Sequence, residues 1–396
     1  MRHVLRTNLF HLLFTQLLFL PQALFSNAQE DSVATSATTE FRSMPEVLST
    51  YFETPESWIG DYGNYRSPLE LDNGTTVADQ KNWDTRRKQL RQWWMKQLGQ
   101  WPPLITKPEL EILDVTNHES YIEQRVSFLW TPDEKTVGYL LIPKTPSKKP
   151  AVITVFYEPE TAIGRGKPNR DFAIQLTKRG FVTLSIGTTE ATTNKTYSIY
   201  YPSLQQAEVA PLSMLAYAAA NAWHVLASHD EVDSERIGIV GHSFGGKWAM
   251  FASCLWDQFA CAAWSDPGIV FDETRPSVNY WEPWYLGYHQ PPWRKRGMIT
   301  EDNPAQGLYL SLRKENKDLH LLHALMAPRP VLISGGSEDP PSRWQALNHL
   351  IQINDLLGYE HRVGMTNRPK HDPNTESNEI IYKFFEHFLM HKKTRH

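Results

Sequence analysis

The chain has 396 residues, with 40 Lys and Arg against 44 Asp and Glu and a formal net charge of −4. Since both signs are spread along the chain, this balance gives no electrostatic basis for a nucleic-acid partner or an anionic membrane surface. The hydrophobic share of 41% and the charged share of 21% are typical of a globular protein with a sizeable core. A small molecule or a polymer is therefore the expected kind of substrate.

The first 28 residues resemble a secretory signal peptide. Arg2 and Arg6 precede an apolar stretch over residues 9–25, and the small residues at 26–28 are typical of a cleavage site. An uncleaved membrane anchor is the alternative, but polar residues and a proline interrupt the stretch and leave it short for a span. We therefore expect residues 1–28 to be removed and the mature protein to be periplasmic or secreted, with no membrane partner.

Two segments separate this signal from the main domain. Residues 29–45 are rich in Ser, Thr, Ala and Glu, which is the composition of a flexible leader. Residues 46–105 contain apolar side chains at helical spacing from Asp79 to Leu98, and Gly99 follows as a stop signal. We expect 46–105 to be a helical extension packed on a domain that spans residues 106–396.

The main domain has the pattern of an antiparallel hairpin followed by βαβ units. Turn residues separate the strand-like runs Tyr121–Leu129 and Thr136–Ile142, and from Pro150 short β-branched runs alternate with helical segments. The expected buried strands are Ala151–Phe156, Val182–Ile186, Ile237–Val240, Cys261–Trp264 and Val331–Ile333. The expected helices are Asp171–Arg179, Leu212–Ser228, Gly245–Leu255 and Trp344–Leu357. A hairpin that leads into a mostly parallel sheet flanked by helices predicts the α/β-hydrolase fold.

The alternation of strands and helices breaks at residues 271–310, which are rich in Pro, Gly, Trp and Tyr. We interpret this segment as an aromatic-rich insertion over the carboxyl ends of the strands. Trp281 and Trp284, followed by the basic run at 293–296, combine flat apolar faces with cations that suit an acidic sugar. A hydrophobic lid with solvated basic residues is the alternative interpretation.

The strongest motif is Gly241-His242-Ser243-Phe244-Gly245, a G-x-S-x-G sequence placed between a predicted strand and a predicted helix. In that context a sharp turn exposes the serine hydroxyl at the amino end of the helix, where developing negative charge is stabilised. Ser243 is therefore the predicted nucleophile, and a turn with an idle serine is the alternative.

A serine nucleophile needs a histidine base and a carboxylate that orients it. His371 follows the strand-like run Arg362–Met365 and precedes the predicted final helix, so it is the expected base. In the usual chain order the acid follows the penultimate strand, which favours Asp339 after Val331–Ile333. Asp266, at the end of the strand that follows the nucleophile, is the rival acid.

Two backbone N–H groups should stabilise the oxyanion. Phe244, directly after the nucleophile, is expected to supply one of them, and Tyr157 or Glu158 the other. The sequence contains no phosphate-binding loop, dinucleotide fingerprint or His/carboxylate cluster, so neither a cofactor nor a metal is expected. Cys254 and Cys261, the only two cysteines, are too few for a thiolate metal site, and either a disulfide or two buried thiols fits them.

These features resemble the α/β-hydrolase superfamily over residues 110–391, and more narrowly its dienelactone-hydrolase-like and carbohydrate-esterase members. The sequence is distantly similar to the glucuronoyl esterases, whose motif G-C-S-R-N-G-K-G-A is matched here at Gly241, Ser243, Gly246, Lys247 and Ala249. The resemblance implies that Lys247 helps to bind a sugar. Some members carry the acid 23 residues after the nucleophile, which is the position of Asp266. Phe244 stands where that family has an arginine that supports the oxyanion.

The sequence thus predicts an exported serine hydrolase, acting on a carbohydrate ester or a small carboxylic ester through an acyl-enzyme. A peptidase or amidase of the prolyl-oligopeptidase type is the first alternative, because the same catalytic residues serve both reactions. A sugar-binding protein that kept the fold, or a lyase that uses the same pocket, also remains open. Arg343 and Trp344, just after Asp339, are expected to line the substrate pocket.

Overall fold

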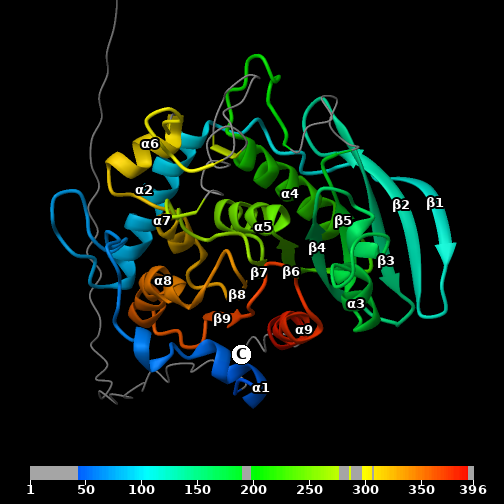
Figure 1. Ribbon diagram of the computed structural model, residues 1–396. Helices are drawn as coiled ribbons and strands as arrows, with labels where there is room; N and C mark the ends of the chain where they lie inside the picture. The colour runs from blue at the N-terminus through cyan, green and yellow to red at the C-terminus, as the bar shows by residue number, and fades with distance from the viewer. Residues whose placement is uncertain (1–42, 190–197, 276–284, 287–296, 306, 391–396) are drawn as a thin grey trace, which may run out of the picture. The chain divides into compact units, whose positions relative to one another are not determined.

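A nine-stranded sheet lies at the centre of the computed structural model (Figure 1). The structure describes residues 43–189, 198–275, 285–286, 297–305 and 307–390. The predicted signal peptide and most of the predicted leader lie outside the described residues, so both stay predictions.

The strands run in the spatial order β1-β2-β3-β5-β4-β6-β7-β8-β9. The first three strands pair antiparallel, as does β3 with β5, whereas all pairs from β5 through β4 to β9 are parallel. The sheet has the predicted arrangement, with the predicted hairpin at β2 and β3. The bounds are β1 Glu111–Asn117, β2 Tyr121–Leu129, β3 Lys135–Pro143, β4 Lys149–Val155, β5 Val182–Ile186, β6 Val232–His242, β7 Cys261–Ser265, β8 Val331–Gly335 and β9 Val363–Asn367.

Helices follow the parallel strands and also precede the sheet. The α-helices are α1 Glu46–Ser49, α2 Gln80–Leu98, α3 Phe172–Lys178, α4 Pro211–Ala227, α5 Phe244–Leu255, α6 Gly307–Lys314, α7 His320–His323, α8 Trp344–Leu356 and α9 Thr375–Leu389. Short 3-10 turns are η1 Thr50–Phe52, η2 Glu56–Trp58, η3 Thr161–Ile163, η6 Ala324–Met326 and η7 Pro341–Arg343. The predicted helices of the main domain are confirmed within a few residues.

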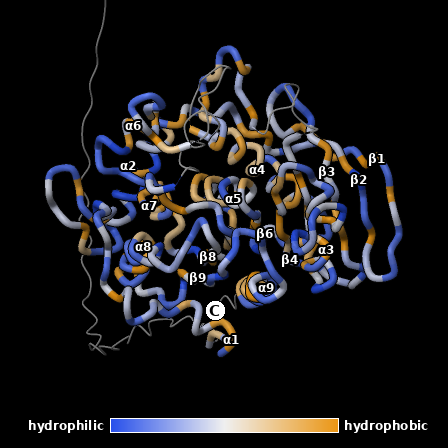
Figure 2. The backbone as a smooth tube through the Cα atoms, viewed as in Figure 1, coloured by the Kyte–Doolittle hydropathy of each residue, from blue (hydrophilic) through white to orange (hydrophobic). Residues whose placement is uncertain are grey.

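Both faces of the parallel part of the sheet are covered, as its continuous apolar strands require. One apolar cluster joins one face to α2, α4, α5, α7 and α8, and a second cluster joins the other face to α1, α3 and α9. Figure 2 shows the apolar residues that line α4, α5 and α9. The architecture is the predicted α/β-hydrolase fold.

Helix α2 packs its apolar stripe against the core next to α7. Its first turn is capped by Asp79, whose side chain accepts a hydrogen bond from the backbone N–H of Asn82 at 2.8 Å. Gly99 ends the helix at a φ of 86°, and a Cβ there would lie 2.1 Å from the carbonyl oxygen of Glu208. The tryptophans Trp83 and Trp94 are buried beneath the helix, so this segment is held by apolar packing.

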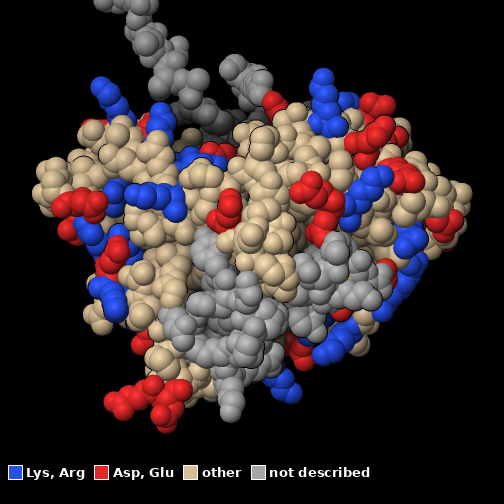
Figure 3. Space-filling model, turned by 90° about the horizontal axis from the view of Figure 1, so that it is seen from above, with Lys and Arg blue, Asp and Glu red and all other residues tan. Residues whose placement is uncertain are grey.

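Three further sequence expectations concern the surface and the thiols. Basic and acidic residues are interspersed on the face seen in Figure 3, in keeping with the near balance of charge. Within the described part of the chain, every helix is too short or too polar to cross a bilayer. Cys254 and Cys261 are buried free thiols, so the thiol interpretation holds and the disulfide does not.

Candidate active site

Ser243 occupies a sharp turn between β6 and α5, with a positive φ of 58°. Non-glycine residues rarely adopt this conformation, and it persists only where the surroundings hold it. The backbone N–H of Ser243 donates to the carbonyl of Ser265 at 2.8 Å, which ties the turn to the end of β7. A Cβ at Gly245 would lie 2.0 Å from the carbonyl oxygen of Val155, so only glycine lets the turn approach β4 this closely.

A continuous chain of hydrogen bonds joins the serine, a histidine and a carboxylate. Ser243 Oγ lies 2.8 Å from His371 Nε2, and His371 Nδ1 lies 2.7 Å from Asp266 Oδ2. The Asp266 side chain is fully buried, whereas that of His371 is 36% exposed. This is the geometry in which a histidine takes a proton from a serine while a buried carboxylate fixes its tautomer.

The Asp266 carboxylate is held by backbone N–H groups from the loop after β8. Its Oδ1 accepts from the N–H of Gly336 at 2.7 Å, of Asp339 at 2.9 Å and of Glu338 at 3.1 Å. We call these three donors the amide cradle. Asp266 itself has a positive φ of 50°, a second strained residue at this site. The cradle leaves Oδ2 directed at His371, so the carboxylate has one orientation.

Asp339 occupies a different place from the one expected for the acid. Its carboxylate accepts from the backbone N–H of Gly268 at 2.8 Å and of Ile269 at 2.6 Å, and no hydrogen bond joins it to His371 within the described residues. Burial and the neighbouring Asp266 carboxylate raise the pKa of Asp339. The preference for Asp339 as the partner of His371 is therefore corrected to Asp266. The loop after β8 contributes backbone N–H groups to the Asp266 carboxylate, whereas its Asp339 side chain is bonded to the loop after β7.

The residues expected to form the oxyanion hole lie against one another. Phe244 is the first residue of α5, so its N–H has no intrahelical acceptor. The ring of Tyr157, in the loop after β4, stacks on the ring of Phe244 with centroids 4.3 Å apart. The carbonyl of Tyr157 accepts the backbone N–H of Thr188 at 2.6 Å, which fixes the course of the loop that continues to Glu158. Assignment of these N–H groups to an oxyanion remains a prediction.

Lys247 lies one helical turn after Ser243, and its backbone N–H donates to the carbonyl of that residue at 3.0 Å. Its Nζ donates to the carbonyl of Pro267, and it also lies 5.6 Å from the centroid of the Tyr285 ring. Burial lowers the pKa of Lys247. A cation, a carbonyl and an aromatic face thus meet beside the serine.

The other residues expected to contact substrate have different positions. Trp344 is 2% exposed and belongs to the apolar core. Arg343 is 8% exposed, and its guanidinium donates to Asp272 Oδ2 at 2.8 Å. Both expectations are corrected, because Trp344 is packed within the core and the Arg343 guanidinium is paired with Asp272. Trp281 and Trp284 lie outside the described residues.

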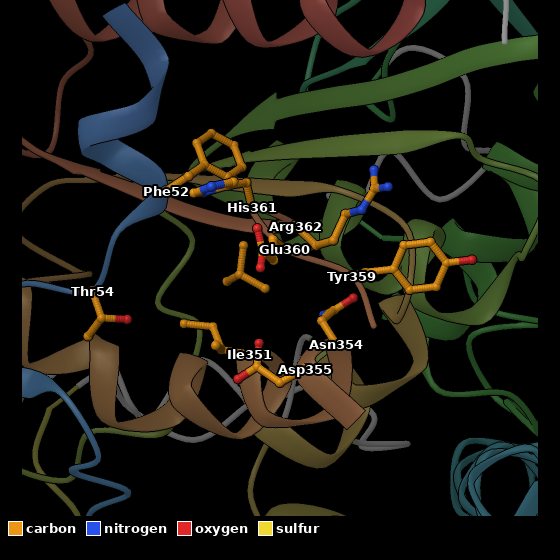
Figure 4. Close-up of a pocket in the computed structure, with 10 residues that line it drawn as sticks. Phe52, Thr54, Ile351, Asn354, Asp355, Tyr359, Glu360, His361 and Arg362 are labelled. Atoms are coloured by element: carbon orange, nitrogen blue, oxygen red, sulfur yellow. The ribbon is translucent and has the colours of Figure 1, made fainter. Parts of the chain in front are cut away.

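A cavity of about 220 Å³ lies near the start of β9, whereas His371 follows the end of that strand (Figure 4). Residues of α8 and of the segment that leads into β9 line it, among them Asp355, Tyr359 and Val363. Val363 is the first residue of β9. The cavity is therefore separate from the serine site.

Two histidines from α7 and α8, His320 and His349, are buried next to each other. His320 Nε2 lies 2.7 Å from the carbonyl oxygen of Arg66, and its ring centroid is 5.1 Å from that of His349. Burial lowers the pKa of His320 to about 3, so the imidazole is neutral in the folded protein. No group of three metal-ligating side chains is found in the described part of the chain.

Sequence comparison matches residues 218–351 to the model of the prolyl oligopeptidase family. The matched segment begins within α4 and ends within α8, so it contains Ser243 and Asp266 but not His371. A search of the curated proteins gives no match.

Several solved structures share the fold. A glucuronoyl esterase from Solibacter usitatus is 18% identical, with a TM-score of 0.64 over 81% of this chain and 96% of that chain. A promiscuous CE15 esterase from the marine bacterial metagenome is 18% identical, with a TM-score of 0.63 over 85% of this chain and 100% of that chain. A glucuronoyl esterase from Caldicellulosiruptor kristjansonii is 17% identical, with a TM-score of 0.60 over 87% and 95%.

At these identities the structural likeness establishes the fold. The predicted α/β-hydrolase fold is confirmed, and the distant similarity to glucuronoyl esterases is confirmed as a similarity of structure. The match to a peptidase family and the esterase neighbours together support the prediction of a serine hydrolase.

Proposed function

We propose that this chain hydrolyses carboxylic esters of carbohydrates through an acyl-enzyme formed at Ser243. The observation that carries the proposal is the hydrogen-bonded chain from Ser243 through His371 to Asp266. It lies at the amino end of a helix, at the carboxyl edge of a parallel sheet, where the fold presents such residues. In this proposal Ser243 is the nucleophile, His371 is the general base and Asp266 orients the histidine.

In the first half of the reaction, Ser243 Oγ attacks the ester carbonyl carbon while its proton passes to His371 Nε2. Asp266 accepts the Nδ1–H of the same ring and stabilises the imidazolium. The N–H of Phe244, with that of Tyr157 or Glu158, receives the oxyanion of the tetrahedral intermediate. When the intermediate collapses, the C–O bond to the alcohol breaks, and His371 returns its proton to the leaving oxygen.

In the second half, water enters where the alcohol has left. His371 takes a proton from the water as its oxygen attacks the acyl carbon, and the same N–H donors receive the second oxyanion. Collapse breaks the bond to Ser243 Oγ, which regains the proton from His371. The products are a carboxylic acid and an alcohol, and the protein returns to its starting protonation state.

The carbohydrate part of the proposal draws on Lys247 and on the neighbours named as glucuronoyl esterases. The Lys247 ammonium and the Tyr285 ring lie beside the nucleophile. A hydrogen-bond donor can bind a sugar hydroxyl, and the flat aromatic face beside it can pack against the C–H groups of the sugar ring. We expect Lys247→Met to raise KM for a sugar ester about 10-fold and to leave a simple aryl acetate unaffected, as loss of one charged hydrogen bond in binding would do.

A peptidase or amidase is the second candidate, because the family model that matches residues 218–351 is that of the prolyl oligopeptidases. An esterase releases an alcohol and an amidase releases an amine, so the leaving group distinguishes the two candidate functions. The test is hydrolysis of a panel of uronate methyl esters, acetylated sugars, aryl esters and aminoacyl-proline amides, with Ser243→Ala as the control. Turnover of sugar esters that the control lacks supports the proposal, and turnover of the amides alone would replace it with the second candidate.

Export is the remaining part of the proposal. It rests on the basic residues, apolar stretch and small residues of positions 1–28. Protein secreted by its host should begin near Gln29. Amino-terminal sequencing that finds an intact Met1 on cytoplasmic material would contradict export without bearing on the esterase.

A further inference from the structure

Arg368 lies in the loop between β9 and the histidine, three residues before His371. Its side chain turns back into the protein and is 6% exposed. The guanidinium donates through Nη2 to the carbonyl of His371 at 2.6 Å and through Nε to the carbonyl of Asp372 at 2.9 Å. These two bonds close the turn of chain that carries the histidine.

The same guanidinium also reaches the two strands beside it. Nη1 donates to the carbonyl of Ser334 at 2.7 Å and to that of Gly335 at 3.3 Å, at the end of β8. Nη2 lies 3.4 Å from the hydroxyl of Ser265, the residue before Asp266. One planar group therefore joins the loop that carries His371, the end of β7 just before Asp266, and the end of β8 that leads into the amide cradle. A lysine ammonium cannot span these acceptors, because its three donors radiate from one atom.

All these acceptors are neutral, and no carboxylate contacts Arg368 within the described residues. Burial lowers the pKa of Arg368, and the nearby charges of Asp266, Asp339 and Asp372 oppose that effect. The buried positive charge of Arg368 thus lies near Asp266 without forming an ion pair with it. His242 also lies here, with its ring centroid 4.7 Å from that of His371, and burial lowers its pKa well below the ordinary value. Arg170, which is paired with Asp372 at 2.5 Å, is a second cation near this group.

We propose that Arg368 is a positioning residue that sets His371 between Ser243 and Asp266 and supplies a buried positive charge beside them. The inference rests on the proposed function, since it assumes that Ser243 is activated by His371. It predicts that the reactivity of Ser243 depends on the shape of the Arg368 side chain as well as on its charge.

The test measures the rate at which a fluorophosphonate labels Ser243, because that reaction needs the activated serine but no knowledge of the substrate. Arg368→Lys keeps the charge and loses the planar fork, whereas Arg368→Met loses both. The matched control is Arg329→Lys. Arg329 is also bonded to backbone carbonyls, including those of Leu325 at 2.9 Å and Phe259 at 3.1 Å, but it lies before the start of β8.

We expect the labelling rate to fall about 10-fold in Arg368→Lys and about 100-fold in Arg368→Met, because a histidine that is held less well in position activates Ser243 less efficiently. Arg329→Lys should label at the wild-type rate. With an ester substrate, kcat should fall and KM should stay the same.

Thermal melting of each variant gives the folded fraction, to which the rates are referred. Wild-type rates in both Arg368 variants, or losses that Arg329→Lys reproduces, would overturn the inference in favour of a purely structural arginine. If Arg368→Met does not fold, Arg368→Lys decides by the same criterion. Absence of label on Ser243 in the wild-type protein would overturn the proposed function, and this inference with it.

Discussion

The loops after β7 and β8 lie side by side at one edge of the sheet and hold each other. Asp266, in the first loop, accepts from the amide cradle of the second loop. Asp339, in the second loop, accepts from the N–H groups of Gly268 and Ile269 in the first loop. Both carboxylates are fully buried, yet only Asp266 contacts His371.

The two aspartates differ in the partners of their carboxylates. Asp266, at a positive φ of 50°, has its Oδ1 in the amide cradle and its Oδ2 within 2.7 Å of His371 Nδ1. Asp339 precedes two prolines and directs its carboxylate to the neighbouring loop. A buried carboxylate at the carboxyl ends of the strands is thus not enough to identify the partner of the histidine. The groups that are hydrogen-bonded to that carboxylate must be known as well.

The largest effect should follow from Ser243→Ala, which removes the hydroxyl that we propose as the nucleophile. We expect kcat to fall on the order of 10⁶-fold, as in serine hydrolases that lose this residue. Thermal stability should change little, because alanine keeps the backbone of the turn. Steady-state kinetics and a melting curve measure both, and retained turnover would exclude the acyl-enzyme.

Asp266→Asn should have the next largest effect. The amide leaves the geometry nearly intact but favours the wrong tautomer of His371, so we expect kcat to fall about 10⁴-fold with KM little changed. A fall confined to KM would assign Asp266 to substrate binding.

Gly336→Ala tests the amide cradle itself. A Cβ at Gly336 would lie 2.6 Å from Asp266 Oδ2 and 2.4 Å from the carbonyl of Lys370, so the carboxylate must move. We expect kcat to fall about 10- to 100-fold from the lost orientation. The matched control is Gly268→Ala, where the added Cβ meets nothing within 4 Å and only the positive φ of 75° opposes the change. Equal losses in both variants would show that the cradle has no special role.

Asp339→Asn should affect stability more than catalysis. Asparagine offers one acceptor oxygen to the two N–H donors, so we expect a loss of about 1–3 kcal/mol in the free energy of unfolding. The backbone N–H of residue 339, which binds Asp266, is retained. We therefore expect kcat to fall less than about 10-fold, far less than when the histidine tautomer is no longer controlled. Denaturant melts and kinetics of the same preparation separate the two effects.

A change remote from both loops should leave activity intact and alter only the response to pH. The pKa of His320 is about 3 in the folded protein, below its ordinary value of 6.5, so the unfolded chain binds more protons between these values. The free energy of unfolding should therefore fall as the pH drops from 6.5 toward 3. His320→Gln, which keeps a donor for the Arg66 carbonyl, should flatten this dependence. An unchanged slope would show that other groups cause it.

The sequence predicts those features that depend on local pattern. The buried strands from β4 to β8 are marked by short β-branched runs, and the Ser243 turn by its glycines. Strand β1 was not predicted, because all of its residues are exposed and carry no burial pattern. The role proposed for Arg368 was missed as well, since its partners are mostly backbone carbonyls, which every residue has. The choice between Asp266 and Asp339 depends on loop directions that strand order does not determine.

The most direct test of the central claim is the site and rate of fluorophosphonate labelling in the wild-type protein, Asp266→Asn and Asp339→Asn, followed by peptide mapping. The account predicts a label on Ser243 alone, formed about 100-fold more slowly in Asp266→Asn because the base is no longer held in its working tautomer. Asp339→Asn should label nearly as fast as the wild type. A label on another residue, or slow labelling in Asp339→Asn with wild-type labelling in Asp266→Asn, would contradict the account.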